Sequence, residues 1–314
     1  MKCIFCLQDK PPSDEHVIPE SIGGRLRIKE VCRECNSNLS RLVDNPFASC
    51  SLIQLARYNH SLGGKRGIVP FPFGGVGTID TGQRVSVDQH FFPHVKRDFQ
   101  ITKLPDGSLQ VHFVADASDK DKLEQMLGAP LRRALAAEFP NWSPEKLEAE
   151  TTKIVAHAHA QAPVSERKPI KKQWSVGLDD LLFEFLKIAY EMWFLRFGYP
   201  WVEQSETANL LRTAILTRDP SLPIRGQLFC PDVPLPVSDP LKNHLVLQVD
   251  RLCLIRLFNI TCGVGCEEAD GRFILRQEDS RITIQDFVVG TLVEDALSVF
   301  LTKNAPRRPA TPDN

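Results

Sequence analysis

Three scarcities in the sequence narrow the function of this chain before any motif is considered. It has no apolar run of about 18 residues, the length that a membrane-spanning helix needs, so we expect no membrane partner. Basic residues are not in excess, because 38 Lys and Arg stand against 39 Asp and Glu, and a broad basic face for nucleic acid is not expected. Its glycine-rich stretch, residues 61–77, lacks the Gly-Lys-Ser/Thr step of a phosphate-binding loop, which argues against a nucleotide site.

What is present fits a globular chain with more than one region. The 314 residues are 42% hydrophobic and 25% charged, which leaves room for two domains or for one small module and a larger body. Residues 1–45 carry seven basic and seven acidic residues, so any contact with nucleic acid must be local. Nine cysteines without a leader pattern are typical of a reducing compartment, and we expect the chain in the cytoplasm.

The clearest motif is formed by two Cys-x-x-Cys pairs near the start of the chain. Cys3 and Cys6 form the first pair, and Cys32 and Cys35 form the second, with 25 residues between the pairs. Four thiolates in this pattern can close a tetrahedral site around one structural zinc ion. The alternative is that all four are ordinary buried thiols, which the close pairing disfavours.

The residues between and after the two pairs predict a strand, a turn, a strand and a helix. Residues 13–19 have an extended pattern, Gly23 and Gly24 can form a turn, and residues 25–31 alternate basic with apolar side chains. Residues 36–43 then show helical spacing of apolar residues, and the Asp-Asn-Pro run that follows is expected to end that helix.

This order of motifs resembles the HNH endonucleases of the ββα-metal class. The resemblance rests on the two cysteine pairs, the Glu15-His16-Val-Ile-Pro segment, the Gly-Gly turn and the Cys35-Asn36 step, which occur in the order found in one zinc-knuckle branch of that family. It covers about the first 45 residues. Arg27 and Ile28 stand where the family's middle Asn is expected.

The resemblance implies a role for each of four residues. His16 would be the general base that takes a proton from the attacking water, and Glu15 and Asn36 would hold a divalent ion, with Asp44 as a further candidate ligand. Hydrolysis of a phosphodiester needs such a base, and oxygen donors of this kind suit Mg²⁺ or Mn²⁺. Neighbouring strand residues point to opposite faces, so either a kink brings Glu15 and His16 together or one acts indirectly.

Each of these residues also has a structural alternative. His16 could stabilise a turn, and Asn36 could be a helix N-cap, a position where Asn is favoured. Four basic residues could contact phosphate if the second strand lies beside the substrate, or could be solvated surface. These basic residues are Arg25, Arg27, Lys29 and Arg41.

The remaining chain predicts a mixed α+β body. We expect a nuclease module at residues 1–48, a body at residues 49–304 and a flexible tail at residues 305–314. Within the body, residues 61–116 and 221–290 have strand patterns, and residues 118–216 have helical patterns. Residues 179–198 are apolar around much of a helix, which predicts a central or interfacial position. His90 and His94 are separated by Pro93, and a loop role is expected for them.

Together these patterns predict a metal-dependent HNH endonuclease acting on DNA, with RNA not excluded. A role in phage defence, restriction or a mobile element is the context that the resemblance implies. Low basic charge suggests help from a homo-oligomer or an activating protein partner. The alternatives are a zinc module that binds nucleic acid without cutting it and a protein-interaction scaffold.

Overall fold

The computed structural model describes most of the chain. Described are residues 1–106, 108–161, 168–174, 176–224, 226–228, 242–266 and 273–304. The expected tail at residues 305–314 and the thiol of Cys230 lie outside the described residues. In the described part, no helix is both long enough and apolar enough to cross a membrane.

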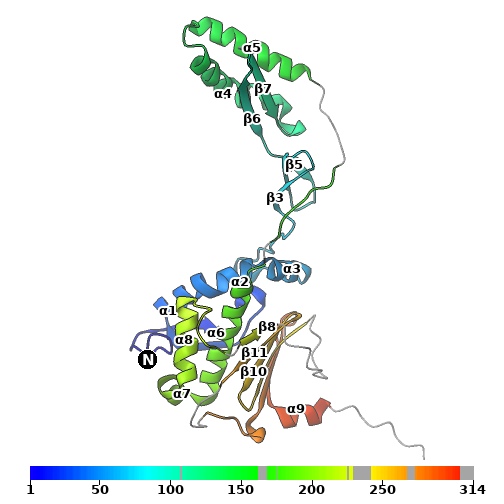
Figure 1. The fold of residues 1–314 in the computed structure, drawn as a ribbon. Helices are drawn as coiled ribbons and strands as arrows, with labels where there is room; N and C mark the ends of the chain where they lie inside the picture. Colours follow the sequence, from blue (N-terminus) through cyan, green and yellow to red (C-terminus); the bar gives the residue numbers. More distant parts are fainter. Residues whose placement is uncertain are drawn as a thin grey trace, which may run out of the picture. The chain divides into compact units, whose positions relative to one another are not determined.

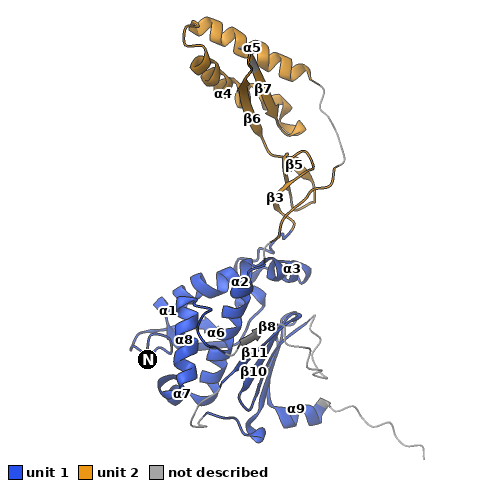
Figure 2. Cartoon of the chain, in the orientation of Figure 1, with its two compact units in different colours: residues 1–72, 175–314 blue, residues 73–174 orange. Residues whose placement is uncertain are grey.

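The chain folds into two compact units of mixed helix and strand, which confirms the α+β class (Figure 2). Unit 1 consists of residues 1–72 and 175–314, and unit 2 consists of residues 73–174. The expected nuclease module and the C-terminal part of the body therefore belong to one compact unit. The module boundary at residue 48 stays a prediction.

The start of unit 1 has the predicted order of a strand, a turn, a strand and a helix (Figure 1). Strands β1 and β2 pair antiparallel, and helix α1 follows β2 directly. The elements are β1 Pro12–His16, the 3-10 turn η1 Glu20–Ile22, β2 Arg27–Cys32, α1 Arg33–Leu39, the π-helical turn η2 Ser40–Asp44, α2 Asn45–Ser49 and α3 Ser51–Asn59.

The prediction that the first helix ends at the Asp-Asn-Pro run is wrong. Helical backbone continues through the π-helical turn η2 into α2. Pro46 has no backbone N–H to donate to the carbonyl of Leu42 one turn earlier, and that carbonyl accepts a hydrogen bond from Arg218 at 2.7 Å instead. Single π-helical turns are often found at functional sites, and this one carries Asp44.

Helix α6, Leu178–Phe197, is the central element of unit 1. Its first turn carries two acidic residues and its last turn a basic one, as the helix dipole favours, and Gly198 with φ of 69° ends it. Nearly its whole circumference is buried, and its apolar residues belong to one core with those of the first 50 residues. Two shorter helices follow, α7 Tyr199–Gln204 and α8 Glu206–Thr217, and α8 runs beside α6 (Figure 1).

A six-stranded antiparallel sheet packs against α6. Its strand order is β13-β12-β9-β10-β11-β8, and α6 contacts β8, β10 and β11. The strands are β8 Gly226–Leu228, β9 Asn243–Val249, β10 Leu252–Leu257, β11 Ile260–Gly265, β12 Arg281–Asp286 and β13 Leu292–Ala296. The sheet is followed by α9 Leu297–Asn304, and the 3-10 turns η3 Gly64–Arg66 and η5 Gln277–Asp279 lie in connections of the same unit.

The sheet also holds the Gly-Gly turn of the N-terminal segment. Gln285 on β12 donates a hydrogen bond to the carbonyl of Gly23 at 2.6 Å and accepts one from the backbone N–H of Arg25 at 2.8 Å. His244 on β9 is fully buried, with its Nε2 2.9 Å from the carbonyl oxygen of Ile22. A Cβ on Gly24 would lie 1.7 Å from the carbonyl oxygen of Ile18, so only glycine fits there.

In its described residues, unit 2 contains two small sheets, two α-helices and one 3-10 helix. The hairpin of β6 and β7 packs its aromatic residues on α4 and α5 around Leu123, Leu127 and Val155. The strands are β3 Gly75–Thr78, β4 Arg84–Val87, β5 Pro93–Val95, β6 Asp98–Lys103 and β7 Leu109–Val114, and the helices are the 3-10 helix η4 Ala117–Lys122, α4 Leu123–Glu138 and α5 Pro144–Ala160.

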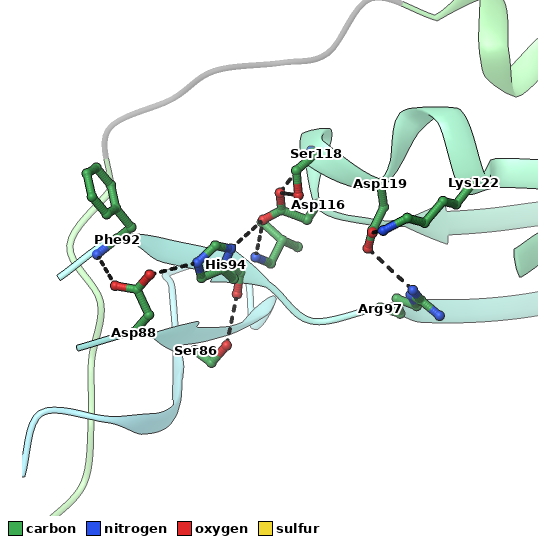
Figure 3. A network of polar contacts seen from close by, with 10 residues as sticks. Ser86, Asp88, Phe92, His94, Arg97, Asp116, Ser118, Asp119 and Lys122 are labelled. Carbon is green, nitrogen blue, oxygen red and sulfur yellow. Dashed lines mark hydrogen bonds and ion pairs between the residues drawn. The ribbon is translucent and has the colours of Figure 1, made fainter. Parts of the chain in front are cut away.

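A polar network ties the three-stranded sheet of unit 2 to the start of η4 (Figure 3). His94 on β5 lies between two carboxylates, with its Nε2 3.3 Å from Asp88 and its Nδ1 3.7 Å from Asp116. Asp116 also accepts hydrogen bonds from the backbone N–H groups of Val95 and Ser118, at 2.9 and 3.0 Å. A hydrogen bond from the Ser118 hydroxyl at 2.6 Å, together with these two, holds the pKa of Asp116 below its usual value. The expected loop role of His94 is thus replaced by a structural role on a strand.

We predict that Gly24→Ala destabilises the N-terminal segment by about 3 kcal/mol or more, because the new Cβ would overlap a backbone oxygen. Native-state hydrogen exchange of peptides from residues 1–50 measures the free energy of opening. Gly128→Ala is the matched control, since open space surrounds Gly128 inside α4 and the better helix propensity should stabilise by about 1 kcal/mol. Equal opening free energies in Gly24→Ala and wild type would contradict the prediction.

Candidate functional site

The four predicted cysteine ligands come together in unit 1. The sulfur atoms of Cys3, Cys6, Cys32 and Cys35 all lie within 4.8 Å of one another, and those of Cys6 and Cys32 are 3.9 Å apart. A tetrahedral zinc ion with Zn–S bonds of about 2.3 Å would set sulfur atoms roughly 3.8 Å apart. The backbone N–H of Cys32 donates to the sulfur of Cys3 at 3.3 Å, as expected for a thiolate acceptor. The donor set and its spacing therefore fit a zinc ion.

The other described cysteines are not part of this cluster. Cys50, Cys253, Cys262 and Cys266 are all buried, where a free cysteine commonly behaves as a small apolar residue. Burial raises the pKa of the Cys253 thiol, which keeps it uncharged and unreactive.

A second site is a pocket of about 200 Å³, lined by residues from β1, α1, η2 and α2 and from the turn between β1 and β2. All four residues to which the resemblance gives a role contribute to its walls. The lining consists of Glu15, His16, Pro19, Glu20, Ser21, Asn36, Ser40, Asp44, Asn45 and Ala48. The sequence reasoning thus identified residues that the fold does bring to one place.

The strand β1 places both Glu15 and His16 in this pocket although they are neighbours in sequence. Its pairing with β2 shifts register between Ser13 and Glu15, which is a β-bulge. Bulges redirect side chains and are frequent next to active sites. This shift lies before Glu15 and places the extra residue on β2, so it does not decide between the two expected alternatives, although both side chains line the pocket.

Glu15 and Asp44 are joined through a lysine that the sequence analysis did not consider. The ammonium of Lys187, on α6, lies 2.8 Å from Glu15 Oε1 and 2.6 Å from Asp44 Oδ1. The same ammonium donates a hydrogen bond to the backbone carbonyl of His16 at 3.1 Å. Both Lys187 and Glu15 are buried, so water does not screen this ion pair. A residue of the body is therefore part of the candidate site.

Two further carboxylates of α6 lie on the same buried side. Glu184 Oε1 is 3.7 Å from the Lys187 ammonium. Glu191 lies one helical turn after Lys187, and its carboxylate has no hydrogen-bond partner among the described residues. Burial raises the pKa of both glutamates well above the usual value, which favours their neutral forms. Burial alone would lower the pKa of Lys187. The surrounding carboxylates raise this pKa by more than burial lowers it, so the ammonium stays charged.

His16 is available as a proton acceptor. Its side chain is 20% exposed, and its Nε2 lies 3.9 Å from a carboxylate oxygen of Glu20. Partial burial lowers the pKa of the imidazole, and the positive charge of Arg27 lowers it further. A neutral imidazole at the edge of a pocket can accept a proton from water.

Asn36 ties helix α1 to strand β1. Its side-chain amide nitrogen donates hydrogen bonds to Ser13 Oγ at 3.1 Å and to the carbonyl of Asp14 at 2.8 Å. The N-cap of α1 is Cys32, so the alternative that Asn36 caps this helix is wrong. Since the nitrogen is used, the amide oxygen is the atom that Asn36 can offer to an ion.

The basic residues proposed to contact phosphate are on the surface. Arg25, Arg27, Lys29 and Arg41 are all exposed. Arg27 has a long contact of 4.0 Å with Asp14, which leaves most of its donors to solvent. Their role in binding nucleic acid stays a prediction.

The sequence contains one pattern that could have identified the charged residues of α6 as part of the site. Glu184, Lys187 and Glu191 are spaced by three and four positions, so they share one face of an otherwise apolar helix. Charged residues in such a helix must find partners, because an isolated buried charge is too unfavourable. The sequence alone did not show that those partners come from the N-terminal segment.

We predict that Cys32→Ala loses most of the bound zinc, whereas Cys50→Ala retains it. Structural zinc contributes about 10 kcal/mol or more to the folding of small zinc modules, so the first variant should also open faster in residues 1–50. Zinc per chain is measured by mass spectrometry of the purified protein. Cys50 is the matched control because it is buried nearby but outside the cluster. Full zinc content in Cys32→Ala would rule out the cluster as the site.

Comparison with known proteins assigns the segment that forms both sites. Residues 3–50 match the model of a family described as HNH endonuclease. No curated protein and no solved structure matches the chain. The matched segment contains the four-cysteine cluster and the strand, turn and helix that line the pocket with Glu15 and His16. Residues 3–50 of this chain are therefore an HNH endonuclease module.

Proposed function

We propose that the chain is a metal-dependent endonuclease that hydrolyses phosphodiester bonds of DNA. The observation that carries the proposal is the single pocket that brings His16 together with oxygen donors of Glu15, Asn36 and Asp44. A base for water and a set of hard oxygen donors are the two elements that this hydrolysis needs.

The donor set fits Mg²⁺ or Mn²⁺. Glu15 and Asp44 offer carboxylate oxygens, and the hydrogen bonds of Asn36 leave its amide oxygen for an ion. Hard divalent cations prefer oxygen ligands of this kind. When bound, such an ion would offset negative charge on the phosphate and on the leaving oxygen.

His16 would act as the general base. Its partial burial and the nearby Arg27 favour the neutral imidazole, which can take the proton of an attacking water. The contact of the Lys187 ammonium with the His16 carbonyl fixes the backbone from which the imidazole projects. Glu20, 3.9 Å from Nε2, is placed to orient the ring once it is protonated.

Substrate contact would be local. Exposed Arg25, Arg27 and Lys29 lie on or beside β2, the strand next to β1 with the catalytic residues, and could contact phosphates of the DNA backbone. The chain's formal net charge of −1 supplies little long-range attraction, so a second copy or a protein partner would strengthen binding. A cytoplasmic role in defence, restriction or a mobile element stays a prediction from the resemblance.

One observation favours a second candidate, a module that binds nucleic acid without cutting it. The Lys187 ammonium already forms ion pairs with Glu15 and Asp44. A divalent ion would have to bind the same two carboxylates while this positive charge stays beside them, which weakens ion binding. If no divalent ion binds there, the module cannot cut, but the zinc cluster and the exposed basic residues could still bind nucleic acid.

We predict that the purified protein cuts supercoiled plasmid with Mg²⁺ or Mn²⁺ but not with EDTA. His16→Ala should cut about 10²- to 10⁴-fold more slowly, the usual contribution of a general base. The assay compares initial rates of nicking and linearisation on agarose gels. His90→Ala is the matched control, because His90 is exposed in unit 2 and should leave the rate unchanged.

Cutting by His16→Ala at the wild-type rate would refute the assigned base. Absence of cutting in the wild type, with zinc retained and DNA bound, would instead favour the binding module. Cutting that persists in EDTA would exclude the proposed divalent ion.

A further inference from the structure

We propose that Lys187 is a positioning residue of the nuclease site, which holds Glu15 and Asp44 in place and limits the affinity of the site for its divalent ion. This inference rests on the proposed function. It adds a residue from outside the HNH module and states what that residue does to the ion. Lys187 lies on α6, well beyond the segment that matches the family.

The geometry connects three segments at one atom. The Lys187 ammonium contacts Glu15 of β1 at 2.8 Å, Asp44 of η2 at 2.6 Å and the carbonyl of His16 at 3.1 Å. The ammonium donates hydrogen bonds to Asp44 Oδ1 and to the His16 carbonyl, and it forms an ion pair with Glu15 Oε1. Each partner belongs to, or adjoins, a residue that the proposed mechanism uses.

The contacts also restrict which oxygens remain for an ion. Lys187 contacts Oε1 of Glu15 and Oδ1 of Asp44, so an ion bound at the pocket would have to use the second oxygen of each carboxylate or share the first with the ammonium. Both residues line the pocket, as does Asn36. The ammonium therefore orients two carboxylates, and fixed orientation of reacting groups is a large part of catalysis.

The charge of Lys187 acts on the ion directly. A fully buried ammonium next to two ligand carboxylates repels a divalent cation bound by the same carboxylates. Lys187 thus lowers metal affinity while it arranges the ligands. A residue with a purely structural role would affect both properties in the same direction.

A second ion pair between the same parts of unit 1 provides the comparison. Lys2 contacts Glu203 of α7 at 2.6 Å, and both side chains are more than one third exposed. This pair joins the N-terminal segment to the helices of the body but lies away from the pocket lining. It is therefore a matched control for the loss of one lysine between these parts.

The test is the effect of Lys187→Met on Mn²⁺ binding and on cleavage. We expect Mn²⁺ to bind about tenfold more tightly, because a repelling charge is removed. Cleavage at saturating Mn²⁺ should fall by about 100-fold, because the carboxylates are no longer held. Mn²⁺ affinity is measured by electron paramagnetic resonance on protein loaded with zinc, and Lys2→Met should leave both values unchanged.

Parallel losses of Mn²⁺ affinity and cleavage, or no change in either, would overturn the proposal. Zinc content and hydrogen exchange of residues 1–50 show whether the variant is folded. If Lys187→Met does not fold, Lys187→Arg decides the question, since it keeps the charge but has a longer, planar head group. We then expect the Mn²⁺ affinity to stay within about threefold of wild type, because the charge is kept. Cleavage should be at least about tenfold slower, because the larger head group displaces the carboxylates of Glu15 and Asp44. Wild-type cleavage in Lys187→Arg would overturn the positioning role.

The two proposals can fail separately. If the wild type does not cut DNA, the proposed nuclease function fails, whereas the comparison of Mn²⁺ affinities still tests the effect of Lys187 on the ion. If the wild type cuts and Lys187→Met cuts equally well, the function stands and the role of Lys187 is refuted.

Discussion

The burial of one ammonium group constrains the whole of unit 1. Lys187 lies in the middle of α6, a largely apolar and buried helix, and its charge must be balanced there, since the desolvation of an unpaired ammonium would cost several kcal/mol. Glu15 and Asp44 provide that balance from the N-terminal segment. The same contacts hold β1 and η2 on α6, so the requirement of one charge helps to determine where the pocket residues Glu15, His16 and Asp44 lie.

Apolar packing makes this arrangement one cooperative structure. The zinc-cluster segment, α6, α8 and one face of the six-stranded sheet share a single hydrophobic core. The sheet adds direct hydrogen bonds to the Gly-Gly turn through His244 and Gln285. The body therefore contacts the HNH module at β1 and at the Gly-Gly turn, so the geometry of the module depends on residues far away in the sequence.

The sequence was sufficient where the determinants are local. The spacing of the cysteines predicted their cluster, and the Glu-His and Cys-Asn steps predicted residues that share a pocket. Residues 179–198 were expected to form a central helix, and α6 lies at that place. Lys187 was missed because its partner Asp44 is 143 positions away, and no local pattern encodes that contact. The helix stop at Pro46 was wrong because the carbonyl one turn before Pro46, that of Leu42, finds a donor in Arg218, far away in the sequence.

The insertion of unit 2 into unit 1 has a consequence for synthesis on the ribosome. Asp44 and Lys187 are 143 positions apart, and at roughly 5–20 residues per second the ribosome needs about 7–30 seconds between them. During that interval the nascent chain has its zinc ligands and His16 but neither α6 nor its ammonium. The HNH module therefore acquires its supporting core only late in translation, so an incomplete chain lacks the assembled pocket.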